Sequence, residues 1–408
     1  MIKETNIEIW SAIMGSGKTM AIIKILNRNP KGKIIFVTEY NDEIERILHA
    51  VTSNTIHEPL ASHGEGSKKK HLLKLLSAGV NVATTHALFA MLQKEDYHLL
   101  EGYTMFLDEV LNVIEKIAIA KRDIQLLLRD NVIGIDSSQK LFVIDSEYNG
   151  EFEKRVARIE KGETFLFQNQ LIWSVSPDIF KSLKHVIITT YNFEGSYMYN
   201  YFRMHKFTIR IKVLHSAGRF KVSNYINLYN GKLNDKNSKP KKFTLGDGGS
   251  VNKTPLASGY YKLATKSKLS HLSKRATNFF RYWCKTPSSL NAYAVYEKQD
   301  EKLTNDRFGD LIAVNARATN KYGYKRSMAY LVDMYPDPTI ENYFKSQGVK
   351  MDENAWSLSV LLQWIFRGCI RNVGNESLIN SAGDWDKLNL FIPSFRMRTL
   401  FEEWLRKH

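Results

Sequence analysis

A glycine-rich segment near the N-terminus has the residue types that bind phosphate. Ala12-Ile13-Met14-Gly15-Ser16-Gly17-Lys18-Thr19 follows a β-rich run and precedes a helix-forming one. Glycines permit the backbone geometry that turns several N–H groups toward one anion, lysine neutralises outer phosphates, and a threonine hydroxyl suits magnesium. The segment therefore predicts a site for ATP and Mg²⁺, with Thr19 as a metal ligand. The residues expected to bind nucleotide are Ala12, Met14, Gly15, Ser16, Gly17, Lys18 and Thr19.

An acidic pair further along the chain would complete the chemistry of phosphate transfer. The apolar run Tyr103–Leu107 ends in Asp108 and Glu109. A strand that ends there would place both carboxylates at the carboxyl edge of a parallel sheet, beside the phosphate loop. We expect Asp108 to hold magnesium and Glu109 to orient and deprotonate the attacking water, because phosphoryl transfer depends on positioning and charge stabilisation.

A third chemical pattern lies in the second half of the chain. Gln363, Arg367 and Arg371 are four residues apart and would share one helical face, while Trp364, Ile365 and Ile370 pack inward. A motor that uses ATP between two lobes needs positive charge from the second lobe to reach the γ-phosphate. We expect these three residues to take part in catalysis. The competing interpretation is a basic amphipathic helix with a solvated face.

These residues need a particular framework to hold them. The first half alternates β-rich runs with helical patterns, which predicts a parallel sheet wrapped by helices. The expected strands are Ile7–Ala12, Lys33–Thr38, Val80–Thr84, Thr104–Asp108 and His185–Thr190, and β-rich runs return at Asn291–Tyr296 and Asp310–Ala316. The C-terminus carries Met397, Leu400, Phe401, Trp404 and Leu405 at helical spacing. Within the second half, Asn230–Pro255 has the composition of a surface insertion.

Length and charge narrow the class of protein. The 408 residues favour two domains, and the net charge of +16 attracts a polyanion, so nucleic acid is the expected partner. Lysines and arginines interleaved with Tyr260, Tyr261, Tyr282 and Trp283 are candidates for a basic surface. The sequence has no apolar run that could span a bilayer and no secretory signal pattern, and it has only two cysteines, so we expect a cytoplasmic protein.

Taken in order, these motifs resemble those of superfamily-two helicases, in particular the compact viral kind found in bacteriophages and in the motor region of herpesvirus origin-binding proteins. Ala12 at the first glycine position is the form seen in that superfamily, and valine after the acidic pair suits the viral group. Ile188–Tyr191 is similar to the third helicase motif, which links nucleotide state to strand binding. The resemblance implies nucleic-acid contacts at Thr38, Thr84, Thr85, His86, Arg317, Thr319 and Asn320.

The resemblance implies an α/β fold of two RecA-like lobes, each a mostly parallel sheet flanked by helices. The lobes would span residues 1–200 and 205–408, the second with the arginine helix and a basic insertion at about 230–285. The sequence departs from the family in its third and sixth motifs. In the sixth, Phe366 precedes Arg367, and the spacing from Arg367 to Arg371 is longer than in the family. Which arginine reaches the nucleotide therefore stays open.

The expected function is an ATP-dependent helicase or translocase on single-stranded or forked DNA, monomeric, with replication proteins as further partners and phage replication, recombination or repair as the setting. In a viral setting the location would be the host cytoplasm. Three alternatives stay open: a nucleic-acid-stimulated ATPase that does not unwind, an RNA helicase, and a nucleotide-switched binding module without turnover. No membrane partner is expected.

Overall fold

The computed structural model describes residues 5–28, 32–214, 221–236, 241–244, 250–296, 303, 308–314, 321–372 and 387–408. The chain forms two compact units. The first consists of Met1–His215 together with Asp337–Asp352, and the second of Ser216–Pro336 together with Glu353–His408. A short segment from the second half of the chain thus belongs to the first unit.

The first unit contains a parallel sheet whose strands appear where the sequence has apolar runs. Its strand order is β12-β1-β11-β5-β2-β4-β3, and every pairing is parallel. Residues 34–37 of β2 and 186–188 of β11 are all apolar because both faces of the sheet are covered. The strands are β1 (Asn6–Ser11), β2 (Lys33–Thr38), β3 (Ile56–His57), β4 (Asn81–Thr85), β5 (Tyr103–Asp108), β11 (His185–Thr190) and β12 (Ile209–Val213).

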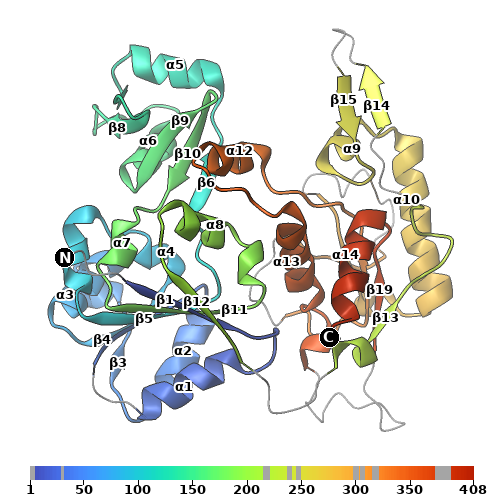
Figure 1. Ribbon diagram of the computed structural model, residues 1–408, viewed down its shortest axis with the longest axis horizontal. Coiled ribbons are helices and arrows are strands. Elements are labelled where there is room, and N and C mark those ends of the chain that lie inside the picture. The colour runs from blue at the N-terminus through green and yellow to red at the C-terminus, as the bar shows by residue number, and fades with distance from the viewer. Residues whose placement is uncertain are drawn as a thin grey trace. The chain divides into compact units, whose positions relative to one another are not determined.

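Helices cover both faces of this sheet (Figure 1). On one face, Ile22 and Leu26 of α1 and Ile44 and Ile47 of α2 pack with Phe36 and other sheet residues in one buried cluster. The helices that flank this sheet are α1 (Lys18–Arg28), α2 (Asn41–Ala50), α3 (Lys68–Ser77), α4 (His86–Phe89), α7 (Asp178–Lys181) and α8 (Tyr197–Met204).

An antiparallel sheet is inserted in the first unit between β5 and β11. Its order is β6-β10-β9-β8-β7, from β6 (Ile114–Ile117), β7 (Ile133–Ile135), β8 (Lys140–Val143), β9 (Glu163–Phe167) and β10 (Gln170–Ser174), with α5 (Lys121–Arg129) and α6 (Glu153–Glu160). Helix α12 (Pro338–Ser346) packs beside β6, where the Lys116 ammonium lies 3.2 Å from the Asp337 carboxylate (Figure 1). This sheet was not predicted from the sequence. The signal for it is the two-residue turn Gln168-Asn169, both with positive φ, which joins two strands as a tight hairpin.

The second unit contains a smaller parallel sheet of order β13-β19-β18-β16-β17. Its strands are β13 (Ile226–Leu228), β16 (Asn291–Ala294), β17 (Asp310–Leu311), β18 (Ser327–Tyr330) and β19 (Leu388–Phe391), and β14 (Lys241–Thr244) pairs with β15 (Ser250–Lys253) as a separate hairpin. Helices of this unit are α9 (Ser258–Leu263), α10 (Lys266–Asn278), α13 (Glu353–Ile365) and α14 (Phe395–Leu405), and a π-helical turn, Phe279–Cys284, continues α10.

Two parallel sheets flanked by helices confirm the predicted fold class of two RecA-like lobes. The C-terminal helix is also confirmed, with Met397, Phe401 and Trp404 buried along one side of α14. In the part of the chain that the structure describes, no helix combines the length and apolar character needed to cross a membrane.

Candidate phosphate-binding site

The phosphate loop leaves the carboxyl end of β1 and leads directly into α1. The Ala12 N–H donates to the Thr190 carbonyl (3.2 Å), which anchors the start of the loop to β11. Gly15 and Gly17 have φ values of 79° and 85°, a left-handed backbone that favours glycine. Helix α1 starts at Lys18 and has no acidic residue in its first turn, so its positive end faces the loop unopposed. This is the backbone arrangement that binds a phosphate group.

Lys18 lies inside the loop, and its side chain is only 8% exposed. Its ammonium group donates to the Ala12 carbonyl (2.9 Å) and the Ile13 carbonyl (3.4 Å), and lies 3.9 Å from a Glu109 carboxylate oxygen. The loop carbonyls thus hold the lysine beside the loop's own N–H groups. A cation in this position is ready to neutralise an anion bound by those groups.

The acidic pair stands at the carboxyl end of β5, beside β11. The Thr189 hydroxyl donates to the Asp108 carboxylate (3.0 Å), and the Thr190 hydroxyl donates to the Glu109 carboxylate (2.8 Å). Glu109 has a φ of 65°, which is uncommon for a residue with a side chain, and its N–H donates to the Thr189 carbonyl (3.0 Å). Because β11 lies between β1 and β5 in the sheet, its two threonines hold both carboxylates next to the phosphate loop.

The charges at this site influence one another. Burial raises the pKa of Asp108 to about 6, and the neighbouring charge of Glu109 acts in the same direction, whereas the hydrogen bond from Thr189 opposes them. A divalent cation beside Asp108 would relieve this cost of burying the negative charge. Among the described residues no group of three or more His, Cys, Asp or Glu side chains could hold a metal ion. Magnesium does not need one, since it is commonly bound by one or two carboxylates, waters and substrate phosphates.

The residues expected to contact nucleic acid in the first unit share one edge of the sheet. Thr38 ends β2 and pairs in register with Thr85 at the end of β4, and His86 begins α4. The Thr38 and Thr84 side chains are buried, however, and the Thr85 hydroxyl accepts from the Leu88 N–H (3.2 Å) as a helix cap. Strand contacts at this edge stay a prediction. Arg317, Thr319 and Asn320 lie outside the described residues.

The arginine helix of the sequence analysis is interrupted, so that prediction was wrong in its geometry. Helix α13 ends at Ile365, Arg367 stands in the following turn, and Arg371 lies in a separate 3₁₀ turn, Cys369–Asn372. Gly368 lies in this turn, and an added Cβ there would come within 2.5 Å of the Met328 sulfur and 3.1 Å of Leu388. A glycine therefore fits where the turn packs closely against β18 and β19.

Among residues 363–371, the apolar side chains lie where the sequence predicts them and the polar side chains do not. Trp364, Ile365 and Ile370 are buried in the second unit, which confirms the predicted inward packing. Arg367 is only 5% exposed, while Gln363 and Arg371 are half-buried. The three polar residues therefore do not form one exposed helical face. Their part in catalysis stays a prediction.

Two arginines to which the sequence analysis assigned no role have clear contacts. The Arg396 guanidinium donates to the Asp333 carboxylate (2.9 Å), the Met334 carbonyl (2.9 Å) and the Ser357 hydroxyl (2.8 Å). The Arg398 guanidinium donates to the carbonyls of three residues, namely Ile392 (3.1 Å), Pro393 (3.2 Å) and Asp235 (3.1 Å). Both arginines hold loops at the ends of strands in the second unit.

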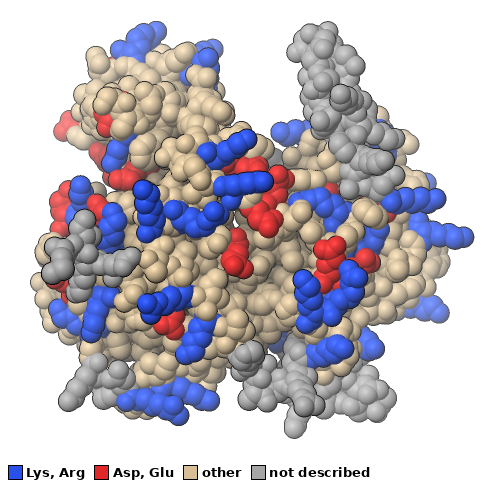
Figure 2. Space-filling model, in the orientation of Figure 1, with Lys and Arg blue, Asp and Glu red and all other residues tan. Residues whose placement is uncertain are grey.

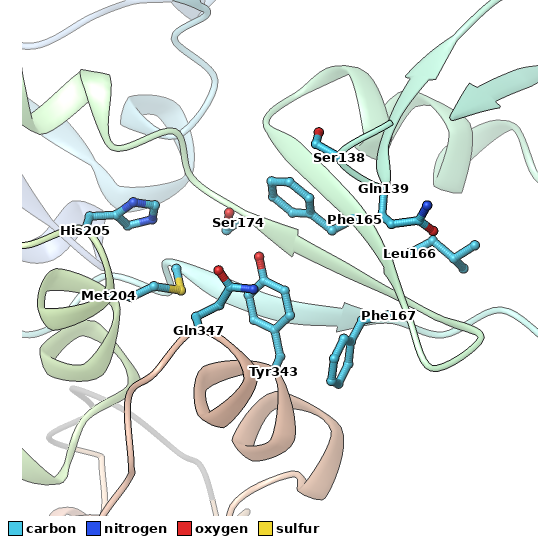
Figure 3. A pocket seen from close by; sticks show the side chains of 10 residues that line it. All are labelled: Ser138, Gln139, Phe165, Leu166, Phe167, Ser174, Met204, His205, Tyr343 and Gln347. Carbon is cyan, nitrogen blue, oxygen red and sulfur yellow. The ribbon is translucent and has the colours of Figure 1, made fainter. Parts of the chain in front are cut away.

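An aromatic pocket of about 400 Å³ lies in the first unit, between the antiparallel sheet, the end of α8 and α12 (Figure 3). The Tyr343 ring of α12 lies 6.1 Å from that of Phe165 and 5.5 Å from that of Phe167. Burial lowers the pKa of His205, at the other side of the pocket, to about 4. No lysine or arginine lines the described pocket, so its chemistry differs from that of the phosphate site.

The fold and the site together define an α/β protein with a glycine-rich loop between β1 and α1 and an acidic pair beside it. Over 98% of its length the chain is 30% identical to the SPbeta prophage-derived uncharacterized protein YonV of Bacillus subtilis (strain 168), of which it covers 98%. Residues 220–405 match the model of the YonV C-terminal Rossmann-like domain. The chain therefore belongs to the YonV family. A solved structure of S. tokodaii Xpd4 is similar with a TM-score of 0.49 and 13% identity, over 98% of this chain and 94% of that one.

Proposed function

We propose that the chain is an ATP-driven helicase or translocase that acts on nucleic acid. The observation that supports this most directly is the convergence of Lys18, Asp108 and Glu109 at one edge of the first unit's parallel sheet. They come from segments about ninety positions apart, yet Lys18 and Glu109 lie 3.9 Å apart and both carboxylates accept hydrogen bonds from β11. Chemistry at a γ-phosphate needs this combination of cation and carboxylates.

Each residue has a distinct task in this proposal. The loop N–H groups and Lys18 bind the phosphates of ATP, and Thr19 with Asp108 would hold Mg²⁺, which neutralises charge that develops during phosphoryl transfer. Glu109 accepts a proton from the attacking water at its carboxylate. Thr190 keeps that carboxylate oriented through its 2.8 Å hydrogen bond. Arg367 and Arg371 of the second unit are the candidates for the positive charge that stabilises the transition state.

The finer features of the proposal concern the substrate and the setting. The net charge of +16 supports nucleic acid as the partner. The relative's description as prophage-derived supports a role on phage DNA, in replication, recombination or repair. We propose single-stranded or forked DNA as the substrate, a monomer as the working unit and the host cytoplasm as the location. Comparing unwinding of DNA and RNA forks separates a DNA helicase from an RNA helicase and from a translocase that does not unwind.

The test of the function is nucleic-acid-stimulated ATP hydrolysis by wild-type protein and by Lys18→Ala. We expect the variant to keep its fold and to lose ATP turnover by orders of magnitude, because the loop loses its only phosphate-neutralising side chain. Lys24→Ala, an exposed lysine on the same helix, is the matched control and should hydrolyse ATP at the wild-type rate. Near-normal turnover in folded Lys18→Ala would reject the assignment of the site.

A further inference from the structure

A basic groove of about 530 Å³ lies in the second unit, between the loop that follows β13 and one face of α10. The loop contributes Lys232 and Lys236, and the helix contributes His271, Lys274 and Arg275. The helix residues recur at three- and four-residue spacing and so share one face of α10. In Figure 2, lysine and arginine side chains stand along the edge of the molecule where Figure 1 places this helix.

The loop wall of this groove is held in place by hydrogen bonds. The Arg275 guanidinium donates to the Leu233 carbonyl (2.5 Å) and to the Asp235 carboxylate (3.0 Å). From α14, Arg398 donates to the Asp235 carbonyl (3.1 Å), and the Asp235 N–H donates to the Pro393 carbonyl (2.9 Å). The loop is thus fixed from two helices. Through its contact with Asp235, Arg398 helps to position the loop that forms one wall of the groove.

The groove carries an excess of positive charge. Asp235 is the only carboxylate among the described residues that line it, and its charge is matched by Arg275. Lys232, Lys236 and Lys274 are exposed, and within the described part of the chain no ion pair is found for any of them. Lysines without carboxylate partners in a concave surface concentrate the field and attract an anion. The exposed amide of Asn278 is a neutral donor in the groove, whereas the Asn234 amide donates to the Tyr229 carbonyl (3.0 Å).

The form of the groove favours a chain of phosphates over one small anion. A single buried anion is bound by enclosed, converging donors, whereas these lysines are exposed and spread along an open surface. Flexible lysines act as point charges that suit the many weak contacts of a polyanion. One turn beyond Asn278, the ring of Tyr282 is 73% exposed. A basic groove followed by an exposed ring on the same helical run is a combination that suits single strands, because a base can stack on the ring.

We propose that this groove binds the phosphodiester backbone of a single nucleic-acid strand, with a base stacked on Tyr282. The proposal rests on the nucleic-acid motor function proposed above and extends it to a defined surface of the second unit. Lys232 and Lys274 neutralise phosphates from the two walls, and the Asn278 amide contacts sugar or phosphate oxygens. The contacts are to the backbone, so binding is independent of sequence.

The test uses the full chain and a short fluorescein-labelled oligothymidine. We expect Lys232→Ala/Lys274→Ala to bind it at least about tenfold more weakly, and the slope of log affinity against log salt to fall by roughly 1.4 for two lost phosphate contacts. Lys121→Ala/Lys154→Ala, which removes two exposed lysines from the first unit, is the control with the same change in charge. Tyr282→Ala should weaken binding about fivefold, and Tyr282→Phe should bind like wild type because the ring remains.

The outcomes separate the groove from the motor function. An equal loss in both double variants, or no loss in either, overturns the groove. Tighter binding of a duplex than of the single strand, with the same dependence on Lys232 and Lys274, overturns the assignment to a single strand. If wild-type protein binds no oligonucleotide and its ATPase is not stimulated, the proposed function fails together with the groove. If wild type is stimulated normally and Lys232→Ala/Lys274→Ala matches it, only the groove is rejected.

Discussion

Both parallel sheets have carboxylates at the ends of their strands, but the carboxylates of the two units have different partners. At the edge of the first unit's sheet, Asp108 and Glu109 each accept a hydrogen bond from a threonine hydroxyl, and the Lys18 ammonium lies 3.9 Å from a Glu109 carboxylate oxygen. After β18 of the second unit, Asp333 is fully buried and bonded to Arg396 at 2.9 Å.

The contacts of these carboxylates distinguish residues proposed to take part in catalysis from residues that stabilise the fold. The buried Asp333 carboxylate is paired with Arg396 inside the second unit, and removing one partner of such a pair costs stability. Asp108 and Glu109 are instead held by neutral hydroxyls, so in the proposed function both carboxylates keep their capacity for a metal ion or a proton. We call the edge with Asp108 and Glu109 the reactive edge, after the function proposed for it, and the edge with Asp333 and Arg396 the structural edge.

The largest expected effect comes from Glu109→Gln at the reactive edge. The amide keeps the shape of the side chain but cannot take a proton from water, so the hydrolysis rate should fall by roughly 10²- to 10⁴-fold while ATP still binds. Single-turnover hydrolysis and nucleotide titration measure the two effects separately. Glu101→Gln, an exposed carboxylate near the start of β5, is the control and should hydrolyse normally. A folded Glu109→Gln that no longer binds ATP would show that the roles of Asp108 and Glu109 are misassigned.

At the structural edge, Arg396→Ala should lower the free energy of unfolding of the second unit by roughly 3 kcal/mol, because Asp333 is left buried without its partner. Burial already raises the pKa of Asp333, and without Arg396 that pKa rises further. A carboxyl whose pKa is higher in the folded state costs stability as pH rises above its unfolded pKa. The deficit should therefore be larger at neutral pH than at acidic pH.

Denaturant unfolding at several pH values measures this deficit. Arg122→Ala, whose side chain is 95% exposed, should unfold like wild type at every pH. Unchanged stability in Arg396→Ala would remove the distinction between the two edges.

Arg367 and Arg371 test whether the second unit is only a scaffold. If they stabilise the transition state, Arg367→Ala or Arg371→Ala should cut stimulated ATPase at least about tenfold, or about 1.4 kcal/mol of barrier, with strand binding intact. ATPase rates per folded molecule measure a catalytic role of these arginines, and melting temperatures measure a structural one. Should both variants hydrolyse ATP at the wild-type rate with full stimulation, the positive charge comes from another part of the chain.

Much of the reactive edge could be predicted because its signals are local. The strand, glycine loop and helix at Asn6–Arg28 adjoin one another in sequence, and an apolar run that ends in Asp108-Glu109 marks its own carboxyl end. Other features depend on contacts between distant residues. The turn after α13 packs Gly368 closely against Met328 and Leu388, and α12 lies with the first unit through contacts such as Lys116 with Asp337. A single sequence does not reveal such pairs.

The smallest expected effect is at Thr190, which orients Glu109 without touching the reacting atoms. Thr190→Val keeps the shape of the side chain and loses the hydroxyl that donates to Glu109 at 2.8 Å. Glu109 would still be present but less often in its working orientation, so the hydrolysis rate should fall by less than about tenfold, which is less than 1.4 kcal/mol of barrier. Thr190→Ser restores the hydroxyl and should restore the rate.

At the structural edge, Ser357→Ala removes the hydroxyl that Arg396 contacts at 2.8 Å, and should leave ATP hydrolysis unchanged. Steady-state ATPase with and without oligonucleotide compares these variants, and equal rates in Thr190→Val and wild type would mean that Glu109 is held by its own backbone conformation instead of by β11.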